Sequence, residues 1–384
     1  MTTDTGAWDV VVIGMGAAGV AAALTAKQAG KKVLIVARSP GATALSSGAV
    51  DGAGGQAAEF MATSFPSLHL GMALFLPTVY GNWKSTSMSL ASQAGASPAP
   101  ARPGEVVVVR FSDVEDTAGN VGSLVGRGAG NPQFSFRDVS IPLLGGGRKA
   151  GVFEAAGAVD MDTGIARAAG ERLRAAITPG KTVMALIPPV MGIRLYSEAI
   201  AAFSMSAGLP VFEMLAGVPS VPGQRWQAAL EDAVARALVE VQNDDVVRFT
   251  GEGDRVMSVG TASGAELRAA SFVLATGKFI GGGVHSGDGF SEPLFGLQVH
   301  CGKAGPTVFV GDLAGSRICD SHQAMSAGLR TDDRLRPVDG FGRATYTNLF
   351  AAGAVLEERH ASYGIHGIGN SVNEGIDAGR FASM

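Results

Sequence analysis

The residues with the clearest chemical potential are glycines near the N-terminus whose spacing suits a phosphate group. Gly14, Gly16 and Gly19 form a Gly-x-Gly-x-x-Gly pattern directly after the β-branched run 9–13. A turn without side chains lets a pyrophosphate approach the backbone N–H groups at the start of a helix, whose positive dipole end stabilises the anion. The pattern predicts a nucleotide-phosphate site that includes Ala18.

This glycine turn needs flanking elements to hold it in place. Residues 9–13 and 32–36 have the composition of short buried strands, and the Ala- and Leu-rich segment between them has helical spacing. Strand, glycine turn, helix and strand make the βαβ unit of a dinucleotide-binding fold. Glycine is abundant, with 55 in 384 residues, so an empty Rossmann-like unit is the alternative.

One expected part of this unit is absent. The acidic residue that binds a ribose hydroxyl normally ends the second strand. Ala37 stands there instead, followed by Arg38. We leave two interpretations of Arg38 open, a phosphate contact in the cofactor site and a solvated loop charge.

A loop of small residues and hydroxyls at 40–49 follows the second strand. Its composition also fits an ordinary connection. Its hydroxyls and backbone N–H groups are suited to the polar edge of a planar ring. The residues that we expect to contact a cofactor are Thr43, Ser46, Ser47 and Gly48.

Two distant segments favour a flavin over a nicotinamide. One strand-like run ends at Thr276 and Gly277, and another ends at Gly353 and Ala354. Both resemble strand ends in flavoproteins of the fumarate reductase and glutathione reductase superfamily, in which insertions split the cofactor domain. The resemblance implies that these four residues contact the flavin. It also implies an acidic residue after the glycine, where this chain has Ala354.

The segment 364–372 resembles the flavin-binding terminus of fumarate reductase relatives. A helix that begins there would stabilise negative charge on the reduced flavin. The resemblance assigns cofactor contacts to Gly369, Asn370, Ser371 and Val372. The alternative is a turn capped by Asn370 or Ser371 before a surface helix. His366 lies in this segment and is the candidate catalytic residue, as a proton relay or as a partner of the anionic flavin, with a structural histidine as the alternative.

Several segments, taken in order, resemble the B subunit of anaerobic glycerol-3-phosphate dehydrogenase. They are 46–51, 186–192, 219–225, 274–283, 292–297, 335–337 and 348–355. The resemblance implies a flavoprotein, with FMN or FAD, that passes electrons within a redox complex. It implies a catalytic flavoprotein subunit and an iron–sulfur subunit as partners, and glycerol 3-phosphate and quinone as the complex's substrates.

The segments together predict an α/β fold with a Rossmann-like domain, a mostly parallel sheet and an inserted cap-like α+β domain. We expect the flavin-binding domain at 1–55 and 216–384, and the insertion at 56–215. Arg225 and Arg336 lie in the segments of the resemblance. Two interpretations of these arginines are open. They bind an anion or, as is usual for arginine, they are solvated or bridge parts of the core.

Composition excludes several classes of protein. The net charge of −4 gives no basic face for nucleic acid, and prolines interrupt the longest apolar run, 183–195. Two cysteines cannot hold an iron–sulfur cluster, and the six histidines form no metal-binding pair, so we expect no metal. No secretory leader pattern is present. We expect a cytoplasmic chain without direct membrane insertion. Any association with the inner membrane would be through a partner.

Three functions follow. The first is an electron-transferring subunit that resembles the B subunit named above. The second is a self-contained flavin-dependent reductase or dehydrogenase with its own substrate site. The third is a non-catalytic assembly subunit that retains the flavoprotein fold.

Overall fold

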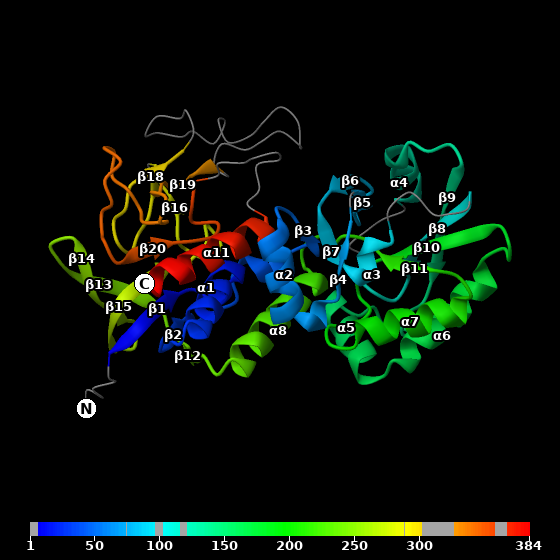
Figure 1. Cartoon of the computed structure of the whole chain (residues 1–384). Coiled ribbons are helices and arrows are strands. Elements are labelled where there is room, and N and C mark those ends of the chain that lie inside the picture. Colours follow the sequence, from blue (N-terminus) through cyan, green and yellow to red (C-terminus); the bar gives the residue numbers. More distant parts are fainter. Residues whose placement is uncertain are drawn as a thin grey trace. The chain divides into compact units, whose positions relative to one another are not determined.

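The computed structural model describes residues 7–73, 75–96, 103–115, 121–287, 289–301, 326–357 and 367–384 (Figure 1). The chain divides into two compact units. Unit 1 comprises Met1–Thr43, Asp51–Met61 and Leu230–Met384, and unit 2 comprises Ala44–Val50 and Ala62–Ala229. The two compact units do not test the predicted domain boundaries, because compactness does not show that a segment folds by itself. The division predicted from the sequence remains a proposal.

Unit 1 is built on a parallel sheet. Its parallel strands are β1 (Trp8–Ile13), β2 (Val33–Val36), β12 (Glu240–Gln242), β15 (Glu266–Leu274) and β20 (Leu349–Ala351). The order is β12-β2-β1-β15, and β20 pairs with β15. Ile13 is in register with Val36 and Leu274, and Leu274 with Ala351, so the carboxyl ends of four strands lie level. These strands and α1 confirm the predicted Rossmann-like α/β fold.

Smaller elements extend this sheet. The antiparallel strands β13 (Val246–Glu252) and β14 (Arg255–Thr261) continue it beyond the first half of β15. Two short antiparallel pairs follow, β16 (His285–Ser286) with β17 (Phe290–Ser291), and β18 (Val299–His300) with β19 (Gly328–Leu329). Buried apolar side chains of β1, β2, β14, β15, β19 and β20 belong to one core.

The first and last helices of unit 1 pack closely against each other (Figure 1). They are α1 (Ala17–Gln28) and α11 (Ile368–Ala382). A Cβ at Gly375 of α11 would lie 2.3 Å from Ala18 O, and one at Gly379 would lie 2.5 Å from Ala22 O. Backbone therefore meets backbone, and glycine is required at both positions.

Unit 2 contains a second parallel sheet. Its strands are β8 (Gly104–Phe111), β9 (Phe134–Ile141), β10 (Thr182–Ile187) and β11 (Val211–Glu213), in the order β11-β10-β8-β9. Helices α4 (Gly122–Ala129), α5 (Val152–Met161), α6 (Gly164–Ala176) and α7 (Tyr196–Ala207) connect or follow these strands. Buried Val, Leu, Ile and Ala side chains between the sheet and α5, α6 and α7 form its core.

Two small antiparallel sheets complete unit 2. One has the order β3 (Ala49–Val50), β7 (Met88–Leu90), β4 (Leu70–Met72), and the other pairs β5 (Phe75–Pro77) with β6 (Trp83–Ser85). The remaining helices of the described chain are α2 (Gly55–Ser64), α3 (Ala91–Ala94) and α8 (Val221–Arg236). In the described ranges, no helix combines the length and apolarity needed to cross a membrane.

The contact between α1 and α11 predicts opposite effects for two helical glycines. Gly375→Ala should lower the free energy of unfolding by about 1–3 kcal/mol, because the new methyl group overlaps the backbone of α1. Gly157→Ala in α5 meets no atom within 4 Å and should raise it by up to about 1 kcal/mol through helix propensity. Urea unfolding of both variants measures the difference. Equal effects would show that α1 and α11 do not make the close contact.

Glu105 makes the sheet of unit 2 sensitive to acid. Its carboxylate is 5% exposed and accepts hydrogen bonds from Arg137, at 3.0 Å, and Thr182, at 2.9 Å. The hydrogen bond from Arg137, chiefly, lowers the pKa of Glu105 from 4.5, against the effect of burial. A lowered folded pKa stabilises the fold above 4.5, and that stabilisation is lost as the pH falls through the lowered value.

The free energy of unfolding of the wild-type chain should therefore fall more steeply below pH 4.5 than that of Glu105→Gln. Denaturant unfolding at a series of pH values measures both slopes. Parallel slopes would contradict a lowered pKa for Glu105.

Candidate functional site

The glycine turn before α1 packs against the end of β15. Gly14 has a φ of +109°, and a Cβ there would lie 2.4 Å from Ala275 O. A Cβ at Gly19 would lie 2.1 Å from Gly14 O. The chain therefore requires glycine at 14 for the tight turn and at 19 for packing of the helix on the turn.

Gly16 differs from these two glycines because nothing in the fold requires it. Its φ is −77°, and the nearest atom to an added Cβ is Thr43 Oγ1 at 3.5 Å. The first helical hydrogen bond runs from Val20 N to Gly16 O, so the amides of Ala18 and Gly19 have no acceptor within α1. The open space and the spare N–H groups are what a phosphate needs.

Thr43 ties the loop after β2 to this turn. The Ala17 N–H donates to Thr43 Oγ1 at 3.2 Å, and Gly41 lies against Gly16. The hydroxyl thus satisfies one of the amides in the first turn of α1. This position agrees with a role for Thr43 in shaping the phosphate-binding turn.

The start of α11 meets the start of α1 at the end of β20. Gly353 has a φ of +81°, and an added Cβ would lie 2.7 Å from the Ala18 Cβ and 3.8 Å from the Ser371 Oγ. Its N–H donates to Glu374 Oε2 at 2.9 Å. Two positive helix ends and the turn at Gly353 and Ala354 therefore converge.

The first turn of α11 is held by the segment that follows Val50. Gly369 N donates to Asp51 O at 2.9 Å, and Asn370 lies against Gly52. The residue that caps the helix is Gly367, without a side-chain hydrogen bond, so the interpretation of Asn370 or Ser371 as the cap is wrong. Val372 is fully buried in the core of unit 1.

Thr276, at the end of β15, has an unsatisfied hydroxyl. Its Oγ1 is buried and has no hydrogen-bond partner within the described ranges. Gly277 follows with a φ of +72°, and a Cβ at Gly283 would lie 2.3 Å from this Oγ1. A buried hydroxyl without a partner is rare in folded proteins, and a bound ligand with polar atoms would satisfy it.

Most of the predicted cofactor residues lie in unit 1. Those at the carboxyl edge of the sheet of unit 1 are Gly14, Gly16, Ala18, Gly19, Thr43, Thr276, Gly277, Gly353, Ala354, Gly369, Asn370 and Ser371. Ser46, Ser47 and Gly48 belong to unit 2. His366 lies outside the described residues. Sequence reasoning missed Glu374, because its only signal is a contact between distant segments.

Arg38 forms an ion-pair cluster that neither sequence interpretation described. Its Nε lies 3.0 Å from Asp245 Oδ2, and an Nη lies 3.7 Å from Asp244 Oδ1. Hydrogen bonds, first of all from the Ser263 hydroxyl, hold the pKa of Asp244 well below its usual range. Asp244 and Asp245, which follow strand β12, therefore hold Arg38 at the end of β2.

The two arginines of the resemblance segments are both paired within their own units. Arg225 is 2% exposed and bound to Glu213, and Arg336 Nε donates to Asp332 Oδ2 at 2.8 Å. Both support the fold. Among the described residues, no three His, Cys, Asp or Glu side chains are grouped so that they could hold a metal.

The whole chain has relatives among known proteins. The family model of the FAD binding domain matches residues 9–69 and 138–371. Two strains of Halobacterium salinarum, ATCC 29341 / DSM 671 / R1 and ATCC 700922 / JCM 11081 / NRC-1, each have a protein named as a probable B subunit of anaerobic glycerol-3-phosphate dehydrogenase. Each is 30% identical over 98% of this chain and 97% of its own length.

Solved structures give a weaker likeness. A 3-ketosteroid-Δ4-(5α)-dehydrogenase from Rhodococcus jostii RHA1 is 14% identical, with a TM-score of 0.41 over 100% of this chain and 98% of its own. The open form of a flavocytochrome c3 fumarate reductase is 12% identical, with a TM-score of 0.42, over 99% of this chain and 79% of its own. These scores are too low to add to the family match.

Gly16 provides a test of the phosphate site. Gly16→Leu should lower the flavin content of the purified protein by about tenfold or more, because the side chain fills the approach to the amides of α1. The fold should remain, since the backbone there suits any residue. Absorbance of the flavin measures the content, and circular dichroism measures the fold.

A matched control is Gly147→Leu, on an exposed loop where a Cβ meets no atom within 4 Å. It should leave the flavin content unchanged. Full flavin occupancy in Gly16→Leu would remove the turn from the site.

Proposed function

The chain belongs to the FAD binding domain family, and on that premise we propose that it is an electron-transferring flavoprotein subunit of a larger oxidoreductase. The broader class, a flavin-dependent oxidoreductase of the fumarate reductase-like superfamily, follows from the family. The finer proposal is a role like that of the B subunit of anaerobic glycerol-3-phosphate dehydrogenase.

The observation that carries this proposal is a match over full length. The chain aligns over 98% of its residues with 97% of each Halobacterium relative. Both units of this chain therefore have counterparts in those relatives.

The residues of unit 1 fit a flavin. The spare amides of Ala18 and Gly19 suit its phosphate groups, and the unsatisfied Thr276 hydroxyl suits a polar atom of the cofactor. A bound flavin supplies reversible electron transfer. The start of α11 contributes a positive dipole end that stabilises negative charge, which favours the reduced form.

The redox partners in this proposal are separate subunits. The complex oxidises glycerol 3-phosphate to dihydroxyacetone phosphate at a catalytic flavoprotein subunit and passes electrons toward quinone. An iron–sulfur subunit carries the clusters, because two cysteines in this chain cannot ligate one. In this proposal the chain is cytoplasmic and reaches the inner membrane through its partners.

Isolated chain should bind FAD but remain oxidised when glycerol 3-phosphate is added. Its flavin should be reduced only after the partner subunits are added, because electrons enter through them. Anaerobic absorbance near the flavin bands follows the reduction, and mass measurement of the released cofactor distinguishes FAD from FMN.

The two alternatives give different results in the same experiment. Reduction of the isolated chain by an organic substrate would contradict the proposal and favour a self-contained dehydrogenase. A chain that holds no flavin after incubation with FAD and FMN would favour an assembly subunit.

A further inference from the structure

Glu374, in the second turn of α11, is the first charged residue of that helix. Its Oε2 accepts the Gly353 N–H at 2.9 Å, so its carboxylate lies at the turn that follows β20. Long helical side chains lean toward the N-terminus of their helix, and Glu374 therefore covers the turn of α11 that contains Ser371. All three residues belong to unit 1.

The backbone at Gly353 brings this carboxylate close to α1 as well. Gly353 has a φ of +81°, and an added Cβ would lie 2.7 Å from the Ala18 Cβ and 3.8 Å from the Ser371 Oγ. The turn therefore packs on the start of α1 with no side chain between them. Because Glu374 accepts the N–H of this same glycine, its carboxylate lies where the first turns of α1 and α11 meet.

The charge of Glu374 is opposite to that of the two helix ends. The N-terminal end of a helix carries about half a positive charge, and neither α1 nor α11 has an acidic residue in its first turn. The Glu374 carboxylate brings a negative charge to the same place. The next acid of α11, Asp377, pairs with Arg380 at 3.4 Å, so these two charges largely offset each other. Glu374 thus balances part of the positive charge of the helix ends.

This balance affects how strongly a flavin holds electrons. Two electrons and one proton convert the neutral oxidised ring into a reduced ring with one negative charge, which the positive helix ends stabilise. A carboxylate at those ends makes the charged reduced form less stable and so lowers the reduction potential. A flavin that passes electrons to a partner subunit needs such a limit, because it must release them again.

We propose that Glu374 sets the reduction potential of the flavin by offsetting the positive ends of α1 and α11 while it holds the turn at Gly353. It is a positioning residue, which acts through this turn and the helix ends. It brings an acid to the turn in which the family resemblance implies one and this chain has Ala354. The inference rests on the proposed function, because it requires unit 1 to bind a flavin that accepts and releases electrons.

The test is Glu374→Gln in the full chain reconstituted with FAD. The glutamine oxygen can still accept the Gly353 N–H, whereas the negative charge is gone. At a fixed solution potential the ratio of reduced to oxidised flavin should rise by about fivefold, which for a two-electron couple is an upward shift of about 20 mV. The dissociation constant of oxidised FAD should not rise. Anaerobic titration against a reference dye measures the potential, and flavin fluorescence measures the affinity.

Glu266→Gln is the matched control, because it removes the same charge from the opposite end of β15. Glu266 is exposed and lies about 26 Å along the strand from Leu274, at the carboxyl edge of the sheet. Salt screens charges over such a distance, so the potential should not change.

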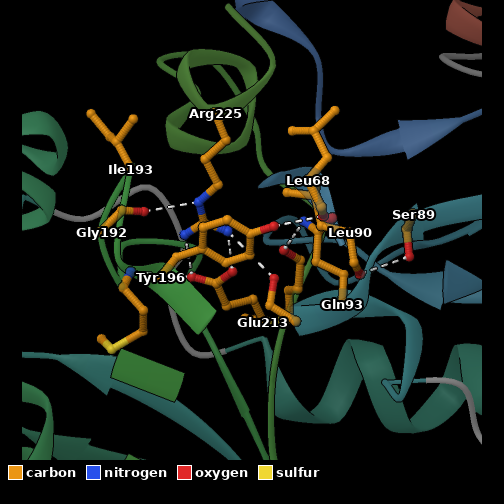
Figure 2. A network of polar contacts seen from close by, with 12 residues as sticks. Leu68, Ser89, Leu90, Gln93, Gly192, Ile193, Tyr196, Glu213 and Arg225 are labelled. Atoms are coloured by element: carbon orange, nitrogen blue, oxygen red, sulfur yellow. Dashed lines mark hydrogen bonds and ion pairs between the residues drawn. The ribbon is translucent and has the colours of Figure 1, made fainter. Parts of the chain in front are cut away.

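Tyr196→Phe is a second control, for loss of stability without loss of charge. The Tyr196 hydroxyl donates to Leu68 O at 2.6 Å in a buried network of unit 2 (Figure 2). This variant should lower the melting temperature of the protein and leave the potential unchanged.

An unchanged or lower potential in Glu374→Gln would overturn the role of Glu374 while leaving the proposed function intact. An equal rise in Glu266→Gln would overturn it too, since the position of the charge would then not matter. A wild-type chain that binds no flavin would overturn both the inference and the proposed function. If Glu374→Gln does not fold, Glu374→Met, which also removes the charge, decides by the same shift in potential.

Discussion

The candidate site depends on backbone that lies in contact with backbone. Gly14 and Gly19 allow the first turn to close against β15, and Gly375 allows α11 to close against α1. Where these segments meet, at Gly353, two helices present their N-terminal ends together. Neither helix has an acidic residue in its first turn, and the carboxylate of Glu374, further along α11, accepts the Gly353 N–H at 2.9 Å. Close approach without side chains thus creates both the space and the charge that an anionic cofactor requires.

Much of the fold was predictable because its signals are local. The run 9–13 and the glycines that follow it specify a strand, a turn and a helix within a few residues. The parallel sheet of unit 2 was not foreseen, because the insertion was predicted only as a cap-like α+β domain. Its strand β8 (Gly104–Phe111) is rich in valine. Its neighbour β9 (Phe134–Ile141) alternates between exposed and partly buried residues, which is typical of an edge strand and gives a weaker pattern. The pairing of such strands depends on residues far apart in sequence, so no short stretch of sequence predicts it.

The site was less predictable because much of it arises from contacts between distant residues. The motif at 14–19 is local, and its spare amides lie where the pattern indicates. Arg38 was ambiguous because its partners, Asp244 and Asp245, lie on another strand. Glu374 carried no signal, since it acts through a contact with Gly353, which is remote in sequence.

The pairing of α1 with α11 has a consequence for biogenesis. The phosphate-binding turn is translated before α11, the helix that completes the site, and most of the described elements lie between the two. Until α11 arrives, the Ala-rich face of α1 that it covers is unprotected, and the nascent chain has half of a site. A complete site for the prosthetic group therefore forms only after α11 has been translated. During synthesis, this unpaired face is a surface for chaperones to protect.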